Sequence, residues 1–116
     1  MNIVDSILTS IKKLLGIGEE YEQFDVDIII HINSVFTILK RLGVGPEEGF
    51  RITGATEVWS DFLSEDDKHF DAVKTYVYQK VKLIFDPPDR TAVLDAYKAQ
   101  IAEFEWTLNV EAESTN

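Results

Sequence analysis

Apolar residues recur at steps of three and four in four separate stretches of the chain, which is the spacing of one face of an α-helix. The first stretch covers residues 3–15 and ends at a pair of glycines, a typical helix stop. The second covers residues 25–42 and ends at Gly43. Its isoleucines also suit a strand, but the apolar pattern continues at helical spacing well past strand length. Both stretches are therefore predicted to be helices.

A third and a fourth helix are predicted in the second half of the chain. Ser64 followed by three acids is typical of a helix start, because serine caps the first turn and carboxylates favour the positive end of the helix dipole. This third helix carries a wide apolar face as far as Phe85, and Pro87 and Pro88 terminate it. The fourth helix starts near Thr91, and its apolar residues form a heptad-like seam.

Residues 43–64 are the least regular part, with several glycines and a proline. Two β-prone runs flank a central glycine there, so the sequence allows a short β-hairpin over residues 50–59. The predicted fold class is therefore mainly all-α, a small bundle of about four helices with that hairpin as an addition. We expect a single helical domain over residues 1–110 and a flexible acidic tail over residues 111–116.

Composition narrows the function classes. The chain has 116 residues, 45% of them hydrophobic, which suits one globular domain. Its formal net charge of −10 argues against a surface that grips nucleic acid. The absence of cysteine excludes disulfides, thiolate metal sites and a cysteine nucleophile. No cleavable leader and no apolar run of membrane-spanning length is present, so we expect a protein of the cytosol with no membrane contact.

Templates for catalysis and cofactor binding fail one by one. The two Gly-x-Gly pairs lack the third glycine of a dinucleotide loop, and no phosphate loop or nucleophile elbow occurs. His31 and His69 lie 38 residues apart, which matches no zinc pattern. His31 is predicted to lie on the flank of the core or within it, and His69 is predicted to be solvated. The acids at 65–67 are contiguous and do not alternate as in a calcium loop, and after the acids at 25–27 an isoleucine, Ile30, stands where such a loop needs glycine. Both groups suit helix starts. We therefore predict no enzyme activity, no cofactor and no metal site.

Some runs of the sequence are informative beyond their periodicity. Residues 73–88 read VKTYVYQKVKLIFDPP and precede a helix that ends in EWTLN at 105–109. Upstream lie IIIHINSVF at 28–36 and WSDFL at 59–63. Together these runs resemble the head–tail connector proteins, also called adaptor or head-completion proteins, of long-tailed double-stranded DNA phages and of prophages of Gram-positive bacteria. The resemblance covers about residues 3–109, and its motifs are packing and turn patterns.

The resemblance implies a structural virion protein of the head–tail junction, present in the host cytoplasm during assembly, with no catalytic residues. Members of the family are small helical proteins that form a ring, often of about twelve copies, beneath the portal protein. They join the portal to a stopper or tail-completion protein while DNA passes through the channel. Portal contacts commonly involve terminal segments, here residues 1–15 and 106–116. Ring size, the channel-facing side and the oligomeric state of the isolated protein, which includes a monomer, are left open.

A closed ring needs two different patches on each subunit, and the wide apolar face of the third helix suits one of them. A wall rich in carboxylates would also repel DNA phosphates, so that DNA slides without binding. An alternative function is a small acidic regulator or a DNA-mimic inhibitor, whose acids should form a row on one face; here they cluster at helix starts and linkers. The predicted interface residues are Tyr76, Lys80, Phe85, Trp106 and Leu108.

Overall fold

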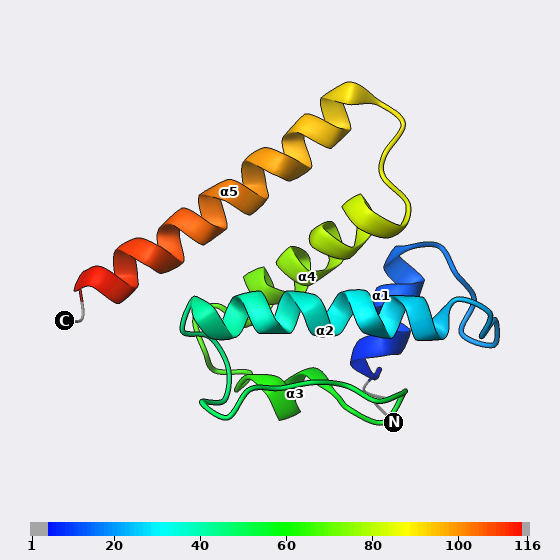
Figure 1. Cartoon of the computed structure of the whole chain (residues 1–116), viewed down its shortest axis with the longest axis horizontal. Coiled ribbons are helices and arrows are strands. Elements are labelled where there is room, and N and C mark those ends of the chain that lie inside the picture. The colour runs from blue at the N-terminus through cyan, green and yellow to red at the C-terminus, as the bar shows by residue number, and fades with distance from the viewer. Residues whose placement is uncertain (1–4, 115–116) are drawn as a thin grey trace.

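The computed structural model describes residues 5–114 of the chain, and within them five helices and no strand (Figure 1). The mainly all-α fold class is therefore confirmed. The third of these helices is a single short turn that the apolar pattern had not indicated. The bounds are α1 (Ile7–Leu14), α2 (Asp25–Arg41), α3 (Trp59–Phe62), α4 (Phe70–Phe85) and α5 (Thr91–Ser114).

The arrangement places α4 at the centre, because α2 packs against one side of it and α5 against another. Figure 1 shows α5 running back antiparallel to α4 after the turn that contains both prolines, while α1 lies beside the first half of α2. The irregular segment between α2 and α4 carries α3 and covers the side of α2 that faces away from α5.

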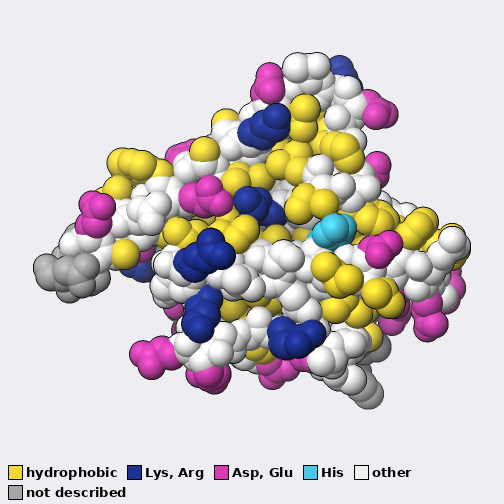
Figure 2. All heavy atoms as spheres, in the orientation of Figure 1, with side chains coloured by type: hydrophobic (Ala, Val, Ile, Leu, Met, Phe, Trp, Pro, Cys, Tyr) yellow, Lys and Arg dark blue, Asp and Glu magenta, His cyan; other side chains and the backbone are white. Residues whose placement is uncertain are grey.

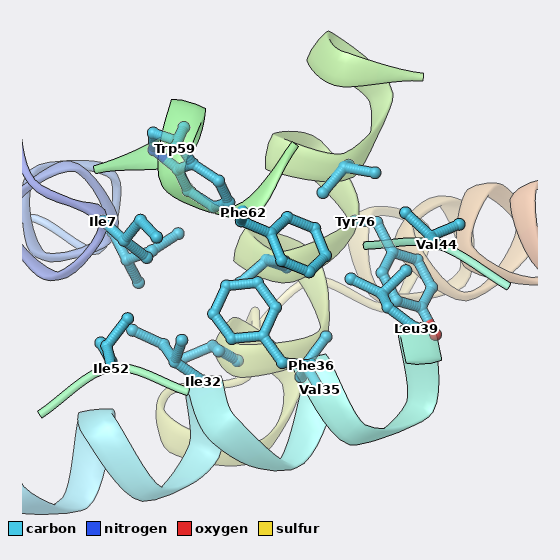
Figure 3. Packing of buried hydrophobic residues seen from close by; sticks show 14 of the residues in the cluster. Ile7, Ile32, Val35, Phe36, Leu39, Val44, Ile52, Trp59, Phe62 and Tyr76 are labelled. Carbon is cyan, nitrogen blue, oxygen red and sulfur yellow. The ribbon is translucent and has the colours of Figure 1, made fainter. Parts of the chain in front are cut away.

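Aromatic rings fill the core between α2, α3 and the loop that precedes α3. Phe36 of α2 lies at the centre, with its ring centroid 4.5 Å from that of Phe62 and 5.2 Å from that of Phe50. Figure 3 shows the rings of Phe36 and Phe62 converging with the aliphatic residues of α2. Trp59 is buried beside Phe36, and its indole Nε1 donates a hydrogen bond to Oγ of Ser10 at 2.9 Å, which ties α3 to α1. Burial of these side chains supplies the main stabilising term.

The β-hairpin predicted over residues 50–59 is wrong for this structure, since no strand forms there. The side chain of Asn33 on α2 hydrogen-bonds to both backbone groups of Ile52. Its amide nitrogen donates to the carbonyl at 3.0 Å, and its Oδ1 accepts from the N–H at 2.7 Å. Farther along, Val58 forms an isolated antiparallel bridge with Ser6, ahead of α1, so its backbone has a partner outside the segment. The backbone groups that a hairpin would pair are therefore satisfied elsewhere.

Two helix boundaries differ from the prediction. The helix expected from Ser64 begins only at Phe70, because the side chains of Ser64 and Asp67 accept hydrogen bonds from nearby backbone N–H groups and hold turns instead of a helix. In particular, Oδ1 of Asp67 accepts from the N–H of His69 at 2.8 Å. At the other end, α5 continues to Ser114, so residues 111–114 form the last turn of that helix. The division into a domain over 1–110 and a tail over 111–116 stays a prediction.

Candidate interaction surfaces

The contact between α4 and α5 combines a few buried apolar residues with a row of polar pairs. The hydroxyl of Tyr76 donates to Oε2 of Glu105 at 2.5 Å, and the amides of Gln79 and Gln100 pair at 2.5 Å. Burial raises the pKa of the Tyr76 hydroxyl, and its hydrogen bond to the Glu105 carboxylate raises it further, so this group stays protonated as the donor. We call this contact the α4–α5 seam.

The seam extends in both directions from that centre. Toward the prolines, the hydroxyls of Tyr78 and Tyr97 lie 3.1 Å apart, and burial raises the pKa of Tyr78 to about 12. Toward the end of α5, Nε2 of His69 lies 2.7 Å from Oε2 of Glu111, and the hydrogen bond from His69 lowers the pKa of that carboxyl. The His69 side chain is only 17% exposed, so the prediction that it is solvated was wrong. The pair could not be predicted from the sequence, because 42 residues separate His69 from Glu111.

The five predicted interface residues fall into two groups. Tyr76 and Leu108 are buried in the seam of a single copy, while Lys80 lies 3.7 Å from Glu105 and Phe85 is half-buried. Trp106 is different, because 66% of its side chain is exposed on α5. The participation of all five in contacts between copies stays a prediction. Of the terminal segments implied for portal contact, residues 1–4 and 115–116 lie outside the described residues.

Among residues 5–114, two pairs of exposed apolar side chains lie one helical turn apart. On α5, Trp106 and Val110 lie one helical turn apart, and Val110 is 40% exposed. On the first half of α2, Val26 and Ile30 are likewise one turn apart, and they are 69% and 56% exposed. We call these the α5 face and the α2 face. Each face is a candidate surface for contact with another protein.

A groove with a cavity volume of about 460 Å³ lies between the second half of α2 and the loop over residues 46–51. Phe36 and Phe50 supply apolar lining, and Lys40, Arg51 and Glu48 supply charge. Within residues 5–114, neither cation of the groove forms an ion pair. Figure 2 shows Lys and Arg side chains gathered on this face around the end of α2, with most Asp and Glu side chains toward its edge. We call this the basic groove.

The segment between α1 and α2, residues 16–24, is held in place by a buried lysine. Lys12 is 2% exposed, and its Nζ donates to the backbone carbonyl of Glu19 at 3.0 Å. The same nitrogen lies 2.9 Å from Oδ1 of Asp25 at the start of α2. The sequence placed Lys12 in the last turn of a helix, where the dipole favours cations, but gave no sign that its side chain is buried. We call these two contacts of Lys12 the clamp. The clamp holds the backbone at Glu19 next to the start of α2, and so positions residues 19–22.

Metal-binding geometry is absent from the described part of the chain, where no group of three or more His, Cys, Asp or Glu side chains lies close enough to hold an ion. None of the helices there is long and apolar enough to cross a membrane. The distinctive features of the fold are instead its polar seam, two exposed apolar faces and the basic groove.

Comparison with known families then identifies the chain. It belongs to the phage connector proteins, whose family model matches residues 7–115. The resemblance inferred from the sequence is thereby confirmed, and the chain has a structural connector role in a phage. No curated protein and no solved structure gives a match.

Proposed function

We propose that this connector is the head–tail adaptor of a long-tailed phage. Copies of the chain form a ring, of about twelve subunits as is common in this family, beneath the portal protein. The ring joins the portal to a stopper or tail-completion protein, and the genome passes through its channel. The protein resides in the host cytoplasm during assembly and at the head–tail junction of the finished virion.

The observation that carries this proposal is the presence of two different apolar faces on different helices. A ring of identical subunits requires a head-to-tail contact, in which one patch of each subunit meets a different patch of its neighbour. The α5 face and the α2 face meet this requirement, because α2 and α5 pack on different sides of α4. A self-complementary dimer would need only one such patch.

The charge of the chain supports the conduit part of the proposal. A net charge of −10 makes most of the surface repel phosphate groups, so a channel built from this protein would not retain DNA. We expect the purified protein to show no micromolar binding to duplex DNA at moderate ionic strength. Retention of the DNA by the protein under these conditions would contradict the conduit role.

The direct test is native mass spectrometry of the chain with its cognate portal protein. We expect a complex that contains one portal ring and a full ring of the connector. Trp106→Ala should reduce the occupancy of that complex by removing the centre of the α5 face, whereas Lys98→Ala, at an exposed position more than two turns away on the same helix, should leave it unchanged. A chain that stays monomeric and ignores the portal would refute the adaptor proposal. Capture of a host nucleic-acid-binding protein would support the inhibitor function instead.

A further inference from the structure

The basic groove combines two cations that form no ion pair with an apolar lining. The chain has ten more acids than cations, yet Lys40 and Arg51 stand beside this groove without an acidic partner in residues 5–114. The groove also exposes part of Phe50, and the aliphatic stem of Lys40 lies across Gly49. An occupant that suits this lining carries carboxylates next to an aromatic or aliphatic side chain.

The same chain presents such a segment at the opposite end of α2. Residues 19–22 read Glu-Glu-Tyr-Glu, all of them exposed, and Tyr21 is 45% exposed. The segment is already ordered: the N–H of Tyr21 donates to the carbonyl of Gly18 at 3.1 Å, and Lys12 holds the carbonyl of Glu19. An ordered segment loses little conformational entropy when it binds. We call it the acidic turn.

The two elements cannot meet within one molecule. The acidic turn precedes the first residue of α2, whereas the groove begins at Asn33 and is lined as far as Lys40. Along α2, the first residue lies about 12 Å from Asn33 and about 22 Å from Lys40, so the helix itself keeps the turn and the groove apart. Complementary elements at opposite ends of a rigid helix suit a head-to-tail contact between neighbouring copies.

We infer that the basic groove of one subunit receives the acidic turn of the next subunit. Lys40 and Arg51 pair with the carboxylates of the turn, and Tyr21 packs on the apolar lining beside Phe50. This inference rests on the proposed ring and gives it a specific subunit contact. Phosphate groups of DNA are the competing occupant of a basic groove, but Glu48 in the lining and the net charge of −10 both oppose their approach.

Engineered cysteines test this contact, because the natural chain has none. Gln23→Cys is placed at the edge of the acidic turn and Thr37→Cys in the groove, both at exposed positions. Under mild oxidation, a mixture of the two single variants should give one covalent dimer, and the double variant should give a ladder of longer oligomers. The matched control pairs Gln23→Cys with Ser60→Cys, an exposed position on α3 away from the groove, and should give no specific product.

Charge reversal tests whether formation of the cross-link depends on the charges of the groove. Adding K40E and R51E to the Thr37→Cys partner should lower the yield of dimer by about tenfold or more. Adding E19K, E20K and E22K to the other partner should restore most of it. Circular dichroism confirms that each variant is folded. Absence of the cross-link both in the free protein and in the ring on the portal, or a cross-link that is insensitive to K40E and R51E, would overturn the inference. The inference would also be overturned if duplex DNA bound the native protein and if K40E and R51E together abolished that binding.

The experiment separates this inference from the proposed function when it is repeated with the portal protein. A full connector ring on the portal without cross-linking between positions 23 and 37 refutes the groove contact and leaves the adaptor role intact. Cross-linking of the free protein at high concentration, together with failure to bind the portal, supports the contact and refutes the adaptor role.

Discussion

Lys12 offers the sharpest test of how this fold is held together. Lys12→Met keeps most of the apolar stem of the side chain and removes the ammonium group, with its charge and its hydrogen-bond donors. The variant loses the hydrogen bond to the carbonyl of Glu19 at 3.0 Å and the ion pair with Asp25 at 2.9 Å. Breaking a fully buried pair costs about 3–5 kcal/mol. The Asp25 side chain is 24% exposed and regains some water, so we expect a loss of about 2 kcal/mol in the free energy of unfolding.

Urea unfolding followed by circular dichroism measures this loss, and for a chain of this size it corresponds to about 8 °C in Tm. Lys13→Met is the matched control, because the neighbouring lysine is 53% exposed and its pair with Asp5 is solvated; we expect a much smaller change there. A double-mutant cycle of Lys12→Met with Asp25→Asn should give a coupling energy of about 1 kcal/mol or more. Equal effects of the two methionine variants, or no coupling, would refute the clamp.

Three further predictions concern stability. Gly45→Ala should cost about 2–4 kcal/mol in urea unfolding, because Gly45 has φ +93° and a methyl group there would overlap the aromatic ring packed on it; no loss would contradict this packing. Asn33→Ala should cost about 2–3 kcal/mol by leaving both backbone groups of Ile52 unpaired, and Asn33→Asp, which keeps the acceptor, should cost less. The pKa of Glu111 is lowered by its hydrogen bond to His69, so its stabilising effect is complete above the unfolded value of 4.5 and is lost as pH falls through the folded pKa. Glu111→Gln should therefore flatten the fall of Tm between pH 6 and 3, and an unchanged slope would contradict the pairing.

The helices that pack on the core were predictable from apolar spacing, because burial of one face imposes that spacing on the sequence. The stops at Gly43 and before Pro87 were predictable for an equally local reason. The start of α4 was not, since Ser64 and Asp67 favour turns and helix starts alike. Whether such residues cap a helix or a turn depends on the packing that follows.

The surfaces were less predictable, because they depend on contacts between distant residues. Trp106 was singled out and is exposed, but Tyr76 and Leu108 carry the same apolar signal and lie inside the seam. Asn33 reads as an ordinary polar residue of a helix, and its bonds to Ile52 arise from a segment 19 residues away. Burial of a lysine such as Lys12 leaves no trace in periodicity.

The antiparallel seam between α4 and α5 also determines how the molecule responds to mechanical load. A pull along the axis of α5 acts on the Tyr76–Glu105, Gln79–Gln100 and Tyr78–Tyr97 pairs at once, so they share the force in shear. A force that lifts one end of α5 away from α4 meets the pairs one after another and peels them apart. The contact is therefore strong along the helix and weak across it.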